Sequence, residues 1–258
     1  MGEPMKRRTF IKWTSGSLLA ASGLDVAALS GLELKDLNVQ LALIQHGKDW
    51  NGRPRALIRL ATEIRKRCNI PLSHHFIEAG LGDIKDLPTP ILFLSGKEAF
   101  SPPSLETARE IRWILDSGGF LFFDDQDGKE NSPFYKSAVE FMARVFPETP
   151  NPVPLQEDHT IYQSYYLLKK PRGRLSRADF LEGWPRGSYT PAMFSHNDLL
   201  GAMEADQSGN WRYNLEIGGG FRRELCFRLG INLMYYCLTL NYKKDRAFPP
   251  ILKRRRRQ

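Results

Sequence analysis

Short apolar runs that alternate with amphipathic segments constrain the fold of this 258-residue chain most strongly. Residues 39–44, 91–94 and 120–123 are mostly apolar, are too few for a buried helix, and are each followed by polar or glycine residues. Such runs are typical of buried strands. We expect a late strand at residues 192–195 and a further strand within residues 72–77.

Apolar residues at helical spacing fill the intervals between these strands. Ser104 and Ser132 stand at the expected N-cap positions of two of the helices. Because strands alternate with helices, the pattern predicts an α/β protein with a mostly parallel sheet and helices on both faces. The helices are expected over residues 57–68, 105–115, 134–145 and about 221–241.

Residues 150–190 interrupt this alternation. They are aromatic and rich in turn-forming residues, and we expect them to form an irregular insertion that contains a hairpin or a lid. No internal repeat is visible, and the length suits a single large core. The expected layout is a signal segment over 1–30, one α/β domain over 38–242 and a basic tail over 243–258.

The N-terminal segment is similar to a twin-arginine export signal. Arg7 and Arg8 are followed by Phe10 and Lys12, and then by a weakly apolar run over residues 13–29. This run contains two glycines and an aspartate, so it is too polar to be a good membrane span. We expect the protein to be exported to the periplasm after folding, with the segment either cleaved or kept as an anchor.

The net charge of +8 does not indicate a nucleic-acid surface. Residues 253–257 supply five positive charges and residues 1–30 supply a net two, so the body of the chain is close to neutral. We therefore expect no nucleic-acid partner. The basic tail is expected to be solvated, and the alternative is weak contact with an anionic membrane surface.

The cysteines do not form a disulfide framework. Cys226 and Cys237 are separated by about 16 Å along one expected helix, and Cys68 ends another. We expect all three to be unpaired and to behave as small apolar residues. No nucleophile-elbow, phosphate-loop or dinucleotide motif is present either.

Polar residues follow the apolar runs, at the points where the strands are expected to end. In open α/β sheets the ligand crevice lies outside the carboxyl ends of the strands, so these residues should gather on one rim. His159, within the insertion, is expected to bend over the same rim. The candidate ligand-binding residues are Asp49, Trp50, Asp124, Asp125, His159, His196, Asn197 and Asp198.

No cluster of cysteine and histidine has zinc-ligand spacing, and the adjacent His74 and His75 point to opposite faces of an expected strand. The sequence therefore assigns no metal ligand, and it leaves the identity of any cofactor open. Asp124, Asp125, His159 and Asp198 would hold a hard cation only if the fold assembled them. A separate candidate is an anion site at residues 218–220, where three glycines precede a helix that starts with Arg222 and Arg223.

Several of these segments, in this order, resemble the domain-of-unknown-function 4159 family. The resemblance covers about residues 38–240 and implies a flavodoxin-like three-layer sandwich similar to class I glutamine amidotransferases. Those enzymes carry a cysteine on the turn after a central strand, where this chain has Ser95-Gly96-Lys97. The resemblance rests on residues 46–50, 94–96, 118–125, 159–162, 195–198 and 229–236.

The missing cysteine favours a non-catalytic binding or scaffold module of the cell envelope, whose partner is a small molecule or an envelope protein. The first alternative is a hydrolase, metal-assisted or acid–base, in which Asp124 or Asp125 is the base and a histidine of the rim assists. The second alternative is a carbohydrate-binding module with Trp50, Tyr162 and Trp184 as stacking surfaces.

Overall fold

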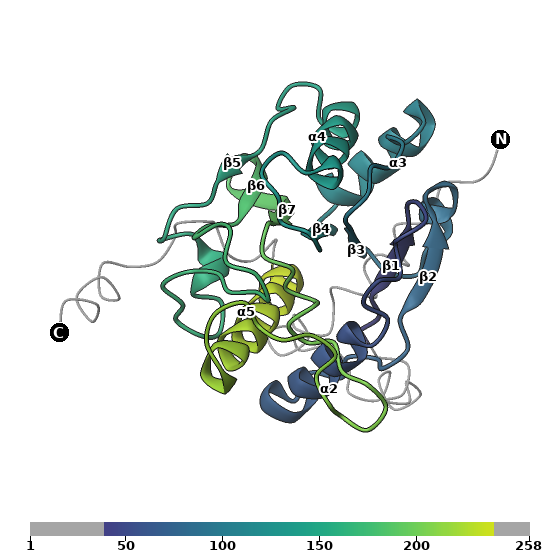
Figure 1. Ribbon diagram of the computed structural model, residues 1–258. Helices are drawn as coiled ribbons and strands as arrows, with labels where there is room; N and C mark the ends of the chain where they lie inside the picture. Colours follow the sequence, from purple (N-terminus) through teal and green to yellow (C-terminus); the bar gives the residue numbers. More distant parts are fainter. Residues whose placement is uncertain (1–38, 240–258) are drawn as a thin grey trace, which may run out of the picture.

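A seven-stranded sheet forms the middle layer of the computed structural model, which describes residues 39–239 (Figure 1). The order β2-β1-β3-β4-β7-β6-β5 is parallel from β2 to β7, and β6 and β5 add an antiparallel extension. The expected signal and basic tail lie outside the described residues. The strands are β1 (Ala42–Gln45), β2 (Ile77–Gly80), β3 (Ile91–Gly96), β4 (Phe120–Asp125), β5 (Val153–Pro154), β6 (Glu182–Arg186) and β7 (Tyr189–Ser195).

Helices cover both faces of the sheet and give three layers (Figure 1). On one face, α2 (Ala56–Cys68) and α5 (Gly220–Thr239) pack on alternate strand residues such as Phe93 and Phe122. On the other face, α3 (Leu105–Asp116) and α4 (Pro133–Val145) pack on the intervening residues. Every residue of β3 and β4 is buried, as expected for strands covered on both sides. The predicted flavodoxin-like α/β sandwich is confirmed.

Capping residues mark the starts of α3 and α4 and the end of α2. The Ser104 hydroxyl accepts a hydrogen bond from Thr107 N (3.1 Å), and the Ser132 hydroxyl accepts one from Tyr135 N (3.0 Å). Asn69 adopts a left-handed conformation after α2, with φ of 54°. These caps pair backbone groups that a helix end otherwise leaves unsatisfied.

The second strand lies later than expected. Leu72 forms only an isolated bridge with Val39, and β2 begins at Ile77. The Ser73 hydroxyl accepts a hydrogen bond from His75 N (3.0 Å), which is a local turn that competes with strand pairing. The predicted strand over residues 72–77 is therefore wrong in position, although a strand at this edge of the sheet exists.

The insertion after α4 is largely irregular, as predicted, and it ends in the hairpin that β6 forms with β7. It also holds the 3₁₀ turn η5 (Thr160–Tyr162) and the two-residue strand β5. The insertion packs on α5, where the fully buried side chain of Asn232 forms hydrogen bonds with the backbone of the insertion. The Asn232 amide donates to the carbonyls of Ile161 (2.9 Å) and Tyr166 (2.9 Å), and its oxygen accepts from Tyr166 N (2.7 Å) and Tyr165 N (3.2 Å).

Gly119 leads from α3 into β4 with no room for a side chain. A Cβ atom there would lie 2.8 Å from the Ile114 carbonyl oxygen and 3.0 Å from that of Pro90. We expect Gly119→Ala to lower the free energy of unfolding by about 1–3 kcal/mol, because backbone atoms must shift. Urea denaturation measures this. Gly219→Ala is the control, since a Cβ there meets nothing within 4 Å; an equal loss in both variants would contradict the steric explanation.

Candidate functional site

The carboxyl ends of the parallel strands meet at one edge of the sheet. Ser95 at the end of β3 is in register with Asp124 of β4, and Asp124 is in register with Ser195 of β7. The strand order reverses between β1 and β3, which is where ligands of such sheets bind. We call this edge, with the loops that follow the four strands, the rim.

The loop after β1, residues 46–55, crosses the rim; we call it the strap. Its Asp49 carboxylate accepts hydrogen bonds from Lys97 N and from Glu98 N (3.0 Å), the two backbone groups that follow β3. Further along, Gly52 lies against Gln126, where a Cβ atom would be 2.4 Å from the side-chain oxygen. The strap therefore runs from β1 across the ends of β3 and β4.

His46 fixes the start of the strap. Its Nε2 lies 3.0 Å from the Ser95 carbonyl oxygen and so carries the proton that it donates. The ring packs against Phe100 and Phe134, at centroid distances of 4.8 and 5.4 Å. Burial lowers the pKa of His46. The imidazole is therefore a neutral, buried anchor, and its Nδ1 has no hydrogen-bond partner among the described residues.

Asp124 holds the loop after β7. Its two carboxylate oxygens accept from Leu199 N (2.8 Å) and Leu200 N (2.7 Å), and the side chain is fully buried. Burial, together with repulsion from the Asp198 carboxylate, raises the pKa of Asp124 to about 8. Because both oxygens are occupied by backbone donors, the carboxyl group is a structural cap for this loop.

Asp198 is the meeting point of three loops. Its carboxylate accepts from Arg53 of the strap, through Nε (3.1 Å) and Nη2 (2.8 Å), and from Arg174 of the insertion through Nε. It also accepts from Gly201 N (3.0 Å) and is fully buried. Its backbone is left-handed, with φ of 49°. One carboxylate therefore joins the strap, the insertion and the β7 loop.

The side chains of two other predicted residues, Asp125 and Asn197, also form hydrogen bonds that hold loops in place. Asp125 accepts from Gly128 N (3.0 Å) and from the Ser132 hydroxyl (2.5 Å), so it ties the end of β4 to the start of α4. Burial raises the pKa of Asp125. Asn197 accepts from Arg177 N (2.7 Å) and donates to the Ala178 carbonyl (2.7 Å), which fixes the insertion.

His196 is at the rim but His159 is not. His196 lies 3.0 Å from the Glu182 carboxylate and packs on Tyr135. His159, by contrast, is buried beside Tyr236 and Thr190, at the amino end of β7. The expectation that His159 bends over the rim is therefore wrong. His159 contacts Tyr236 near the C-terminal end of α5, at the amino end of β7 and away from the rim.

The structure thus gathers seven of the eight predicted residues along the rim, and most of them are buried. Trp50 is half-buried and packs against the core under α2 and α5. Within residues 39–239, no group of three or more His, Cys, Asp or Glu side chains is placed to hold a metal ion. The hard-cation arrangement that includes His159 is not formed, since that residue lies at the other end of the sheet.

The proposed stacking surfaces of a carbohydrate-binding module are also not assembled. Trp184 is fully buried and donates from Nε1 to the Pro150 carbonyl (3.1 Å). Tyr162 is buried and its hydroxyl accepts from Leu181 N (2.8 Å). Of the three aromatic residues, only Trp50 presents part of its surface to solvent, so the rim offers no aromatic platform of the predicted kind.

Arg222 and Arg223 at the start of α5 are likewise engaged with the chain. Arg222 donates to the Leu175 carbonyl (3.0 Å), and Arg223 donates to the carbonyls of Ala202 and Tyr213 (2.9 Å). Their guanidinium groups join the loops beside α5. The Arg222 side chain lies against Gly218, where a Cβ atom would be 3.3 Å from its Cδ, but the hydrogen bonds of both guanidinium groups are made with carbonyls of the chain.

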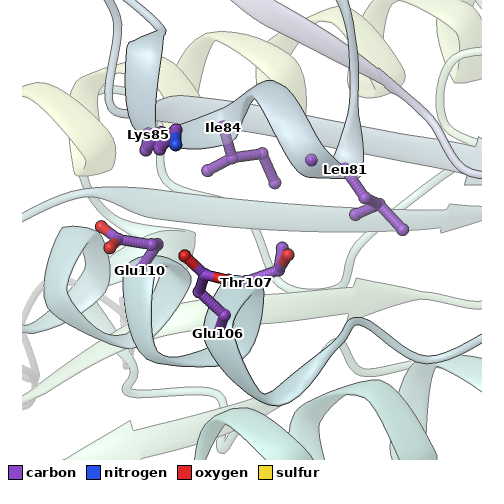
Figure 2. A pocket seen from close by; sticks show the side chains of 7 residues that line it. Leu81, Ile84, Lys85, Glu106, Thr107 and Glu110 are labelled. Carbon is purple, nitrogen blue, oxygen red and sulfur yellow. The ribbon is translucent and has the colours of Figure 1, made fainter. Parts of the chain in front are cut away.

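A pocket of about 190 Å³ lies away from these residues, between α3 and the 3₁₀ helix η4 (Leu81–Asp86). Figure 2 shows side chains from both elements facing one another across it, among them Lys85 above Glu110. None of the predicted site residues lines this pocket.

All three cysteines are free, as predicted. Burial raises the pKa of Cys226 to about 12 and that of Cys237 well above its ordinary value. Burial also raises the pKa of Cys68. A thiol with a raised pKa carries little thiolate and is a poor nucleophile.

Sequence patterns missed Arg53 and Arg174, which complete the rim. Both lie in loops and contact the Asp198 carboxylate. Arg53 is 145 residues from Asp198 in the sequence, and Arg174 is 24 residues from it. A loop arginine has no periodicity, so no local signal marks it as a partner of a buried acid. The pair becomes visible only when the fold brings three loops together.

A family model described as Domain of unknown function (DUF4159) matches residues 40–238, and the chain belongs to this family. The segments that carried the resemblance include the strand ends of the rim and the Asn232 region of α5. No curated protein matches the chain. Among the described residues, no helix combines the length and apolar character needed to cross a membrane.

The raised pKa of Asp124 predicts a pH-dependent stability. The folded state binds the proton more tightly than the unfolded chain, whose carboxyl titrates near 3.8, so the contribution of this group is complete below about pH 4 and falls as pH rises towards 8. Asp124→Asn should be less stable at pH 5 by about 1–3 kcal/mol, because its NH₂ group cannot accept a backbone N–H. The difference should narrow as pH rises and reverse in sign by pH 8, because the wild type loses about 1.4 kcal/mol per pH unit over this range.

Denaturant unfolding of both proteins at pH 5 and pH 8 measures this difference, because titrating groups that do not interact with Asp124 contribute equally in the two proteins. A gap that is constant or widens with pH would show that Asp124 does not have a raised pKa.

Proposed function

We propose that this DUF4159 protein is an exported, non-catalytic binding module of the cell envelope, with an amidotransferase-like fold and its contact surface on the rim. The observation that carries the proposal is the strap. It covers the strand ends where a ligand crevice is expected, and its Asp49 carboxylate occupies the N–H groups of Lys97 and Glu98. A partner therefore meets a closed, polar surface.

The turn after β3 lacks the groups that acyl chemistry needs. Ser95 is 1% exposed and its hydroxyl accepts from Gln126 Nε2 (3.2 Å). The backbone donors that follow it, which could stabilise an oxyanion, are bound to Asp49. Without a free nucleophile or free donors, binding is the function that this turn supports.

The raised pKa of Asp124 favours a second candidate, an acid–base hydrolase, because perturbed carboxyl groups gather at catalytic sites. Against it, Asp124 and Asp125 are buried and each accepts two or more hydrogen bonds from the chain itself. A general base must reach the proton that it removes. The geometry therefore favours binding over hydrolysis.

Export is tested at the signal. Replacing Arg7 and Arg8 by lysine should leave the protein in the cytoplasm, because the arginine pair is the specific part of the resemblance to a twin-arginine signal. Cell fractionation with an antibody measures the distribution. Replacing Lys6 and Lys12 by arginine is the charge-matched control and should not block export. Periplasmic recovery of the double-lysine variant at the normal level would contradict the proposal.

The rim is tested by site-specific photo-crosslinking in cells. A photoreactive phenylalanine derivative at Trp50 should give discrete adducts, since this half-buried aromatic residue lies on the strap. The same residue at Trp113, an exposed position of α3 on the other face, is the control. Adducts that are equal at both positions, or absent at Trp50, would argue against a contact surface on the rim.

A further inference from the structure

Three guanidinium groups surround the ring of Tyr213 beside the rim. The Arg53 Cζ lies 4.1 Å from the ring centroid, the Arg174 Cζ 5.6 Å and the Arg212 Cζ 6.0 Å. All three distances are within the range of cation–π attraction. We call these four residues the arginine–tyrosine cluster. It brings three positive charges together at the point where the strap, the insertion and the loop before α5 meet.

Among the described residues, Asp198 is the carboxylate that forms ion pairs with this cluster, while Glu204 lies within electrostatic reach of Arg212 and Arg53, and Glu216 within reach of Arg174. Asp198 accepts from both Arg53 and Arg174, and it is buried beneath them. Arg212 is exposed and forms no ion pair with any residue that the structure describes. Asp124, the next acid inward, is fully buried, and its raised pKa weakens its contribution of negative charge. Burial also raises the pKa of Glu204, and Glu216 is paired with Arg177, so Asp198 is the main negative charge directly opposed to the three guanidinium groups.

Some N–H donors of these guanidinium groups have no hydrogen-bond partner among the described residues. Arg53 uses Nη1 on the Gly52 carbonyl (3.0 Å), and Arg174 uses Nη2 on the Gln126 carbonyl (3.0 Å). Arg174 Nη1 and the Arg212 guanidinium make no hydrogen bond with described residues. The Arg174 side chain is 22% exposed, so its free nitrogen is within reach of a ligand. Guanidinium groups with free N–H donors bind carboxylate and phosphate oxygens well.

The Arg212 and Tyr213 side chains are not needed to place their own backbone. Arg212 N donates to the Glu204 carbonyl (3.0 Å), and the neighbouring Trp211 pairs with Ala205 in an isolated bridge. The Tyr213 carbonyl accepts from Arg223 (2.9 Å). The segment is thus fixed by main-chain contacts, and a purely structural role does not account for an exposed, unpaired arginine on the tyrosine ring.

We propose that Arg174, Arg212 and Tyr213 form an anion subsite at the edge of the rim, which takes the carboxylate or phosphate group of the ligand. This inference rests on the proposed binding function and gives it a ligand chemistry. Asp198 holds Arg53 and Arg174 in fixed orientations before the ligand arrives, which reduces the entropy lost on binding. Tyr213 keeps the three guanidinium planes close together despite their mutual repulsion.

The test is a titration of the exported protein, followed by NMR chemical shifts of arginine side chains, with inorganic phosphate in one arm and citrate in the other. Ionic strength is held constant with sodium chloride. Wild-type protein should show saturable shifts, and Arg212→Gln should weaken binding about fivefold, as expected for one partly exposed ionic contact. Saturation by phosphate alone assigns a phosphate group, and saturation by citrate alone assigns a carboxylate.

Arg109→Gln is the matched control, because Arg109 is an exposed arginine of α3 on the other face. It makes the same change in net charge and should bind as the wild type does. Thermal melting should show that Arg212→Gln remains folded. Shifts that do not saturate, or equal losses of affinity in the Arg212 and Arg109 variants, would overturn the subsite.

The subsite and the proposed function fail in different ways. If the titrations are flat while Trp50 still forms discrete adducts in cells, only the subsite is wrong. If the anion binds and the protein also hydrolyses an ester or amide in an activity that Asp124→Asn abolishes, the subsite stands and the non-catalytic function is wrong.

Discussion

A pair of buried carboxylates holds the rim together. Asp124 binds the two amides that follow Asp198, and Asp198 binds an arginine from each of two distant loops. Burial and repulsion from Asp198 raise the pKa of Asp124 to about 8, so the pair avoids two full charges, but both carboxyl groups still need hydrogen-bond donors around them. The arginines and the backbone amides supply these donors. The position of the strap, the insertion and the β7 loop therefore depends on one local balance of charge.

This balance also explains why the crevice of the sheet is closed. Parallel sheets of this type usually leave their carboxyl ends open to a ligand. In this chain, the strap extends from β1 to Asp198 and is fastened at Asp49, at Gly52 and at Arg53. A ligand in the usual place would have to displace bonds that the protein makes with itself. The proposed recognition at the outer surface of the rim would avoid this cost.

The sequence predicted the layers of the fold well, because apolar periodicity is a local property that burial preserves. The runs that became β3 and β4 are apolar on both faces, and the caps Ser104 and Ser132 act on backbone amides three residues away. The strand near residue 72 was misplaced, since Ser73 forms a turn within the same run. A local sequence cannot show whether a turn or a strand forms there, because the outcome depends on pairing with the neighbouring strand.

The sequence predicted where the candidate site lies in the fold, but it did not predict the burial and hydrogen bonding of the residues there. Strand ends gathered the acidic residues as topology requires, yet burial and hydrogen bonding depend on loops that carry no periodic signal. Arg53 and Arg174 reach Asp198 through such loops, and His159 lies at the opposite end of α5 for the same reason. The exposure of a carboxylate is decided by the loop that covers it, and this loop is remote in sequence.

The amide of Asn232 has a consequence for how α5 finds its place. Most of the residues of this helix are buried, so hydrophobic burial distinguishes its rotations about the axis less sharply than it does for an amphipathic helix. Only one rotation lets Asn232 satisfy all four of its bonds with residues 161–166, and any other leaves a buried polar group unpaired. Asn232 thus acts together with Gly230, which has no room for a side chain beside Leu60 and Met203, to set the rotational register of the longest helix among the described residues.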